Sequence, residues 1–378
     1  MYKKKLFSRE SGYRLLLVLA AILIALIIAE FGLRILLPAP AEYYVWPPNY
    51  RVTFDPMPGA MPGISGESRF IINSVGIRGD EFSENQQYRI LTMGGSTTEC
   101  LYLDEEEAWP HLLQEQLNGL NYYKVWVGNI GKSALGTPDH ILHMKYLLPQ
   151  YPRIDAIILL IGAAEWKPAS AYSDSLEHAF AIYPNYENFP KDTALWRLGR
   201  QVRNIIVNVH SVQVTKVIEQ AGKPYILKRE QRANAEKIDE MPDLSQYLDE
   251  YGRNLNMIID MARERSIRLI CLTQPSIYKE NMSEQEKALI WAGTVDESGT
   301  KYYSISVLID RMNRINDKTI AICQSRGVEY IDLSNILPKD TTVFYDDFHF
   351  NENGARLVSQ AIFMYLSTME PFFHSASP

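Results

Sequence analysis

The sequence has few cysteines and no run of basic residues beyond its first segment. Its three cysteines, Cys100, Cys271 and Cys323, are widely separated, and none forms a Cys-x-x-Cys pair. This excludes a disulfide framework and a cysteine-based zinc site, and is typical of small buried hydrophobic side chains. The formal net charge is -7, whereas nucleic-acid-binding domains normally present a basic face. Nucleic acid is therefore not an expected partner.

Residues 1–37 have the composition of a membrane anchor. Basic residues between Lys3 and Arg14 precede an uninterrupted apolar run from Leu15 to Ala29. That run is shorter than the ~20 residues of a spanning helix, but the apolar character resumes as far as Leu37 and is broken only by Glu30 and Arg34. These two residues are four apart, so they share a helix face and can pair or extend to the membrane surface.

A cleaved signal peptide is the alternative, because Ala39-Pro40-Ala41 has the small-x-small form of a cleavage site. A glutamate and an arginine lie between this site and the apolar run, which favours an uncleaved single-pass anchor that ends at Pro38. The basic flank predicts a cytoplasmic N-terminus, with the rest of the chain periplasmic or extracellular.

Residues 38–87 are rich in Pro, Gly and Tyr and are interpreted as a stalk that packs on the domain that follows. From residue 88 apolar strand patterns alternate with helical ones, without internal repeats or low-complexity tracts. A polar, Tyr-rich insertion at about 167–242 interrupts the alternation. The pattern predicts an α/β domain over 88–378, with a doubly wound, mostly parallel five-stranded sheet. The predicted strands are Tyr88–Met93, Tyr123–Val127, Ala156–Ile161, Ile267–Leu272 and Val328–Leu333.

Two short segments carry residue types suited to nucleophilic catalysis. "GGSTTE" (Gly94–Glu99) directly follows the first strand and places Ser96 at a tight turn before a helix. The alternative is an ordinary capped turn, with Ser96 or Thr97 as the N-cap. "YDDFHF" near the other end of the chain places Asp346 three residues before His349. One turn of backbone could set the carboxylate beside His349 Nδ1 and leave Nε2 as a base for a serine.

Asp347 is an alternative orienting carboxylate, and a solvated acidic loop is the non-functional alternative. Ligands of doubly wound sheets bind at the carboxyl ends of the strands. The two segments follow the first and last strands of one α/β domain, which is what favours a serine–histidine–aspartate site.

These segments resemble the conserved blocks of the SGNH (GDSL-type) hydrolases, in the "GGST" form of bacterial membrane-anchored members. "NIGKSALGT" (Asn129–Thr137) resembles the second block, "IGAAEW" (Ile161–Trp166) stands at the third and "YDDFHFNENG" (Tyr345–Gly354) resembles the fifth. "NSVGIRG" and "LTQP" also fit such members. The resemblance covers roughly residues 70–368, and the insertion has no counterpart.

The resemblance implies particular roles for residues of this chain. Ser96 would be the nucleophile, His349 the base and Asp346 its orienting carboxylate. The backbone N–H groups of Ser96 and Gly131 would be oxyanion donors. The third donor of the family is an asparagine side chain, and Ala164 stands at its position. Loss of one oxyanion donor costs about 10²–10³ in turnover, so the resemblance implies a slow enzyme if the other groups are in place.

The leading hypothesis is a membrane-anchored serine esterase that removes O-acyl groups, with O-acetyl as the favoured case, from a carbohydrate or another ester. A second is an O-acetyltransferase of cell-surface or secreted polysaccharide, with the same serine, histidine and aspartate. A third is a catalytically impaired glycan-binding or assembly protein, suggested by Ala164. No metal or cofactor is implied, and protein partners are not identified. His140 and His143 lie three apart without a third ligand and are interpreted as surface residues of a helix.

Overall fold

The computed structural model describes residues 9–36, 43–120, 123–162, 190, 193–196, 198–199, 202–203, 216–296 and 298–373. The chain divides into two compact units. The smaller unit comprises Met1–Glu42 and Tyr183–Val214, and the larger unit comprises Tyr43–Ile182 and Thr215–Pro378.

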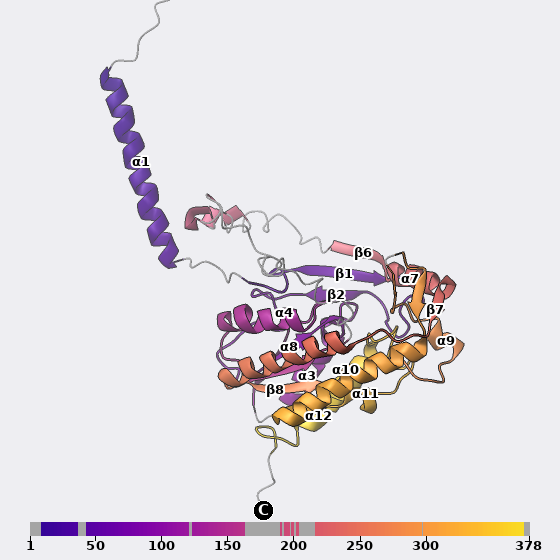
Figure 1. The fold of residues 1–378 in the computed structure, drawn as a ribbon. Coiled ribbons are helices and arrows are strands. Elements are labelled where there is room, and N and C mark those ends of the chain that lie inside the picture. Colours follow the sequence, from indigo (N-terminus) through magenta and orange to yellow (C-terminus); the bar gives the residue numbers. More distant parts are fainter. Residues whose placement is uncertain are drawn as a thin grey trace, which may run out of the picture. The chain divides into compact units, whose positions relative to one another are not determined.

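In the smaller unit, helix α1 (Arg9–Leu36) is continuous through the predicted anchor (Figure 1). Its segment Gly12–Leu36 is long and apolar enough to cross a membrane. The predicted pairing of its two charged residues is confirmed, since Arg34 Nε lies 2.8 Å from Glu30 Oε1.

The larger unit contains the predicted five-stranded sheet. Its order is β10-β8-β5-β3-β4, and every neighbouring pair is parallel. The strands are β3 (Tyr88–Gly94), β4 (Val125–Asn129), β5 (Ala156–Leu160), β8 (Arg268–Leu272) and β10 (Glu329–Ile331). Each lies within two residues of the strand predicted from the apolar runs, and β3 and β5 are central. The fold-class prediction is therefore confirmed.

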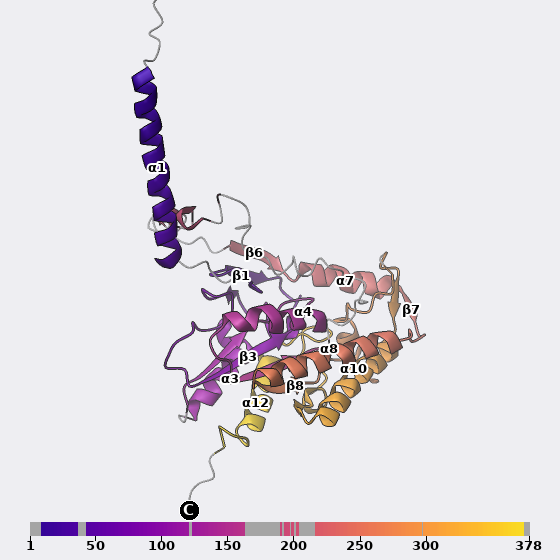
Figure 2. The ribbon, with the colours of Figure 1, turned by 60° about the vertical axis from the view of Figure 1, so that its left-hand side comes forward.

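Helices cover both faces of this sheet, which explains why its strands are apolar without alternation. One face packs on α3 (Trp109–Gly119) and α12 (Glu352–Leu366), while α8 (Ser245–Glu264) packs on the other. Helix α10 (Ile305–Arg326) contributes side chains to both cores. Successive residues of β5 alternate between them: Ile158 belongs to the first core and Ile157 to the second. Figure 2 shows α3 and α8 from a second direction.

Residues 43–87 of the predicted stalk form part of the larger unit. They contain β1 (Arg51–Pro56) and β2 (Ser68–Ile71), which pair antiparallel, and β6 (Lys216–Ala221) pairs with β1 in parallel. Figure 1 shows β6 beside β1. Phe54 and Phe70 are buried in this small sheet. The composition of the segment resembled a linker because β1 and β2 are short and separated by a turn rich in Pro and Gly.

Part of the predicted insertion is also built into the larger unit. After β6 come α7 (Lys223–Asn234) and β7 (Glu236–Ile238), which pairs in parallel with β9 (Lys301–Tyr303). Residues 163–189 and most of 191–215 lie outside the described residues. The remaining elements are α2 (Ser96–Glu99), η1 (Glu105–Glu107), α4 (Thr137–Leu142), η2 (His143–Leu147), η3 (Leu148–Gln150), α9 (Glu284–Lys287) and α11 (Leu333–Ile336).

Candidate active site

The turn after β3 is packed so closely that Gly94, two residues before Ser96, has no room for a side chain. A Cβ at Gly94 would lie 2.4 Å from the backbone oxygen of Leu160 and 2.2 Å from Thr98 Oγ1. Only glycine fits there without displacing the neighbouring central strand. The chain then enters α2 at Ser96, so the serine N–H is in the first turn of a helix and has no intrahelical partner. Ser96 is partly exposed, whereas Thr97 and Thr98 are buried.

A hydrogen-bonded turn before α12 brings Asp346 and His349 together. The backbone closes the turn, since Tyr345 N donates to His349 O at 3.1 Å. Asp346 Oδ1 accepts from the N–H groups of Phe348 at 3.1 Å and His349 at 2.9 Å. Asn351 then caps α12 by accepting from Gly354 N. The one-turn spacing of the acid and the base is thus held by backbone donors as well as by the side chains.

The three predicted side chains form one chain of hydrogen bonds, which we call the Ser–His–Asp cluster. His349 Nε2 lies 2.7 Å from Ser96 Oγ, and His349 Nδ1 lies 2.7 Å from Asp346 Oδ2. An ionised carboxylate only accepts hydrogen bonds, so Nδ1 carries the proton and Nε2 is left to accept from the serine hydroxyl. The predicted proximity of the three residues is therefore found in the structure.

Burial and charge act in opposite directions on this cluster. Burial raises the pKa of Asp346, but the His349 charge and the hydrogen bonds from His349 and Trp291 outweigh it and hold the pKa below its ordinary value. Burial lowers the pKa of His349, but the Asp346 charge and hydrogen bond outweigh that effect and raise it. An ionised Asp346 therefore faces a histidine of increased basicity, as a general base requires.

Asp347, the alternative orienting group, contacts other residues. It accepts from the Tyr278 hydroxyl at 2.6 Å and from Trp291 N at 2.9 Å. Its own burial and the neighbouring Asp346 charge raise its pKa to about 6. Asp347 thus ties the segment around Trp291 to the turn that carries His349.

Trp291 is a part of the site that the sequence did not indicate. Its indole N–H donates to Asp346 Oδ2 at 2.9 Å, so that oxygen accepts from both the histidine and the tryptophan. Lys228 of α7 lies over the indole ring, with Nζ 4.3 Å from the ring centroid. No local motif identifies Trp291, because a segment 55 residues earlier in the sequence supplies this contact.

Gly131 does not have the environment expected of an oxyanion donor. Its N–H already donates to Asn129 Oδ1 at 2.8 Å. A Cβ at this position would lie 2.5 Å from Glu99 N, so the glycine is needed for close packing against α2. The Gly131 N–H is therefore engaged within its own turn, and its role as an oxyanion donor stays a prediction.

Ala134 offers a backbone donor instead. It has φ 66°, a left-handed conformation that is uncommon for a residue with a side chain. It borders the same cavity as Ser96 and His349, and its N–H finds no acceptor within the described part of the chain. Its neighbour Ser133 donates its hydroxyl proton to buried Glu99 and so ties this loop to α2. Ala164, the position of the third donor, lies outside the described residues.

The Ser–His–Asp cluster opens into a cavity of about 860 Å³. Helix α7 and the segment from Trp291 to Tyr303 form much of its wall. Aromatic side chains are its largest group: Tyr102, Tyr225, Trp291, Tyr302, Tyr303 and Phe348. Its charged side chains are Lys228, Asp296, Arg311 and His349. A volume within the ~300–1,000 Å³ range of ligand pockets accommodates much more than a short acyl group.

The other histidine prediction is wrong. His140 and His143 are fully buried, with their Nδ1 atoms 3.3 Å apart, and burial lowers the pKa of His140 to about 3. Helix α8 packs against α4 and η2, which carry these histidines, and the spacing did not show this packing. Among the residues that the structure describes, no group of three or more His, Cys, Asp or Glu could hold a metal ion. All three cysteines are buried, as predicted.

No family model and no curated protein matches the sequence. Solved structures do match. The chain is similar in structure to G-D-S-L esterases. A member of the lipolytic protein G-D-S-L family from Veillonella parvula is 11% identical with a TM-score of 0.39, and the match covers 75% of this chain and 100% of that one.

Two further similar structures bear esterase names. The acetyl xylan esterase AlAXEase is 12% identical with a TM-score of 0.39, over 74% of this chain and 99% of its own. Est24, a carbohydrate acetylesterase from Sinorhizobium meliloti, is 10% identical with a TM-score of 0.39, over 75% and 99%. At these identities and scores the similarity does not extend to activity or substrate.

Proposed function

We propose that this protein is an SGNH-type serine esterase that removes an O-acyl group from a carbohydrate outside the cytoplasm. The observation that carries the proposal is the continuous hydrogen-bonded chain from Ser96 Oγ through His349 to Asp346, with 2.7 Å at each step. If Ser96 only capped a helix, there would be no reason for a buried histidine and a buried carboxylate to form a hydrogen-bonded chain that ends at its hydroxyl.

The geometry supports a two-step acyl transfer. Ser96 Oγ attacks the ester carbonyl carbon while His349 Nε2 accepts the hydroxyl proton, and Asp346 stabilises the imidazolium. The N–H groups of Ser96 and Ala134, two residues that line the same cavity, would stabilise the developing oxyanion. His349 then gives its proton to the departing alkoxide oxygen, which leaves an acyl-Ser96 ester. Water attacks this ester with His349 again as the base, and the acid is released with free Ser96.

Labelling with a fluorophosphonate probe tests this mechanism. We expect the wild-type protein to form a covalent adduct at Ser96 and to hydrolyse a short acyl ester. The variants Ser96→Ala and His349→Ala should lose both properties and remain folded by circular dichroism. Equal labelling of wild type and Ser96→Ala would contradict the proposal and favour the non-catalytic alternative.

The size of the cavity favours a transferase as the second candidate. An acetyl group occupies a small part of about 860 Å³, and the aromatic wall around Tyr225 and Trp291 could hold a sugar acceptor in place of water. Mass spectrometry of the products separates the two reactions. An esterase releases acetate whether or not an oligosaccharide is present, whereas a transferase moves the acetyl group to the oligosaccharide.

We further propose that α1 anchors the protein in the membrane with its N-terminus in the cytoplasm. The support is the basic flank and the apolar segment Gly12–Leu36. The full-length protein should remain in the membrane pellet after alkaline carbonate extraction. Release of a mature chain that begins at Glu42 would instead show that the segment is a signal peptide.

A further inference from the structure

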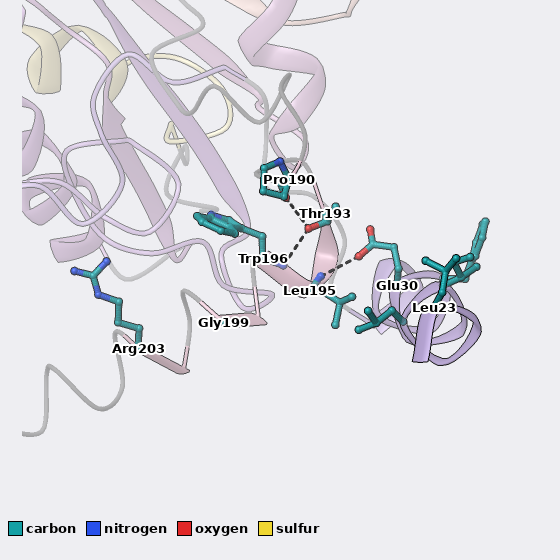
Figure 3. Close-up of a pocket in the computed structure, with 11 residues that line it drawn as sticks. Leu23, Glu30, Pro190, Thr193, Leu195, Trp196, Gly199 and Arg203 are labelled. Atoms are coloured by element: carbon teal, nitrogen blue, oxygen red, sulfur yellow. Dashed lines mark hydrogen bonds between the residues drawn. The ribbon is translucent and has the colours of Figure 1, made fainter. Parts of the chain in front are cut away.

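In the smaller unit, a second segment is fastened to α1 through Glu30. The two oxygens of the Glu30 carboxylate accept from the N–H groups of Ala194 at 2.8 Å and Leu195 at 3.0 Å. Figure 3 shows the carboxylate pointing from α1 to the start of this helical turn. Thr193 Oγ1 accepts from Trp196 N at 3.2 Å and donates to Pro190 O at 2.7 Å. The first N–H groups of the turn, which need acceptors from outside the helix, are thus satisfied.

The position of Glu30 along α1 shows at which level of a membrane this contact would lie. At about 1.5 Å per residue, Glu30 lies about 27 Å along the axis from Gly12, where the candidate span begins. A hydrocarbon layer is about 30 Å thick, so Glu30 and Arg34 lie at its outer boundary. A carboxylate near the membrane is costly unless it is paired. Arg34 and the two backbone donors are its partners here.

An apolar cavity of about 740 Å³ lies between α1 and this segment. Its walls include Leu26, Ile27 and Phe31 of α1 together with Leu195, Trp196 and Arg203. Large apolar side chains remain uncovered around it, since Phe31 is 68% and Trp196 44% exposed. Tryptophan is enriched where the headgroups meet the hydrocarbon. Arg203 extends away from Glu30 in Figure 3, at the far end of the segment.

We propose that the described residues between Pro190 and Arg203 form a second membrane contact, which lies in the outer interface against α1 and seats one acyl chain of an outer-leaflet phospholipid in the cavity. The inference rests on the anchoring proposed above. The apolar walls take the acyl chain, Trp196 lies at the level of the ester groups, and Arg203 lies among the phosphates. Glu30 keeps the segment against the anchor.

A lipid fits these walls better than a second copy of α1. Helices that associate in a membrane do so through small side chains that allow close backbone approach. The α1 side of this cavity presents leucine, isoleucine and phenylalanine instead, and the second segment covers part of that face. A flexible acyl chain can fill the irregular space that remains.

Quenching of tryptophan fluorescence by brominated lipids tests the contact. The full-length protein is placed in phosphatidylcholine–phosphatidylglycerol vesicles with bromine near the headgroup or near the chain end. The emission of Trp196 is obtained by subtracting the spectrum of Trp196→Phe from that of the wild type. We expect bromines near the headgroup to quench this emission more strongly than bromines near the chain end. The emission of Trp291, obtained in the same way with Trp291→Phe, should be quenched by neither lipid. In the Glu30→Ala background the Trp196 quenching should be lost.

Native mass spectrometry tests the occupant. We expect the detergent-solubilised wild type to retain a phospholipid, and Leu26→Trp, which fills the cavity, to lose it. Leu17→Trp is the matched control, because Leu17 is an exposed residue of α1 outside the cavity and should leave the lipid bound.

Three results would overturn the inference, and each differs from failure of the anchor. Unquenched Trp196 in protein that still pellets after carbonate extraction would show that the segment does not touch lipid. Equal lipid retention by Leu26→Trp and wild type would place the lipid elsewhere. Disulfide-linked dimers of a Leu26→Cys variant would show that a second α1 occupies the cavity. Protein that fails to pellet would contradict the anchor itself.

Discussion

Replacing Trp291 by phenylalanine removes one hydrogen bond to the Ser–His–Asp cluster and leaves most of the cavity wall in place. The indole N–H lies 2.9 Å from Asp346 Oδ2, the oxygen that also accepts from His349 Nδ1. Without this donor, Asp346 still accepts from two backbone N–H groups and from the histidine. The variant should therefore fold, and its effect should be on the orientation and the charge of the carboxylate.

The expected magnitude follows from the kind of bond that is lost. A hydrogen bond to a charged group contributes about 1.5–3 kcal/mol. Asp346 is ionised in both the ground and the transition state and keeps three donors. We therefore take about 1.5 kcal/mol, the lower end of that range, as the upper limit of the increase in the activation free energy. We therefore expect kcat of Trp291→Phe to fall by about threefold to tenfold, since a tenfold change corresponds to about 1.4 kcal/mol.

The pH profile should change in a defined direction. The Asp346 charge already raises the pKa of His349. A carboxylate that has lost a donor is more basic and holds the imidazolium more strongly, so the pKa of His349 rises further in the variant. Because the protonated histidine cannot act as a base, the acidic limb of kcat/KM should move to higher pH.

Steady-state hydrolysis of a short aryl ester across the pH range measures both effects. Lys228→Met is the matched control, because it removes the cation over the indole ring and leaves the indole N–H in place. It should keep the wild-type acidic limb. If Trp291→Phe raises KM but leaves kcat and the acidic limb unchanged, Trp291 is only a wall of the cavity and the reasoning is wrong.

Three further substitutions test other parts of the site. Burial raises the pKa of Glu99 from 4.5 to about 7, so its favourable contribution to folding is fully present below pH 4.5 and is lost as pH rises through 7. Between pH 4.5 and pH 7 the unfolding free energy of the wild type should fall by up to about 3 kcal/mol relative to that of Glu99→Gln. If urea denaturation shows the same pH dependence for both proteins, this prediction is wrong. Gly131→Ala should lower the unfolding free energy by about 1–3 kcal/mol through overpacking. Gly119→Ala is the control, because a Cβ at Gly119 meets nothing within 4 Å. Equal melting temperatures of the two variants would refute the packing role of Gly131. Ala164→Asn should raise kcat about 10-fold with little change in KM if it restores an oxyanion donor, and an unchanged kcat would contradict that role.

The segment after β4 shows that a local sequence pattern does not identify which backbone N–H group is free. The segment after β4 contains both Gly131 and Ala134, and the resemblance to the SGNH hydrolases implied the glycine as the donor. The structure assigns that close approach to packing against Glu99. The free amide belongs to Ala134, whose left-handed backbone could not be read from its residue type. The backbone angle of Ala134 thus adds a second candidate donor three residues after Gly131.

Trp291 and the buried histidines illustrate a different limit. Trp291 reaches Asp346 because Asp347 holds its backbone N–H and because α7 packs over its ring through Lys228. No periodicity encodes contacts between three separate segments. His140 and His143 have the spacing of surface residues, yet both are buried. Whether such a helix face is exposed depends on what packs against it.

By itself the sequence determined the apolar N-terminal helix, the five parallel strands and the order of Ser96, Asp346 and His349 along the chain. The helix and the strands follow from local rules, because a long apolar run favours a helix and a strand buried on both faces is apolar throughout. Only the tertiary structure decided that Trp291 contacts Asp346, that Gly131 packs against Glu99 and that Ala194 and Leu195 donate to Glu30. Each of these contacts joins two segments that are far apart in the sequence, and such a contact leaves no periodic pattern in either segment.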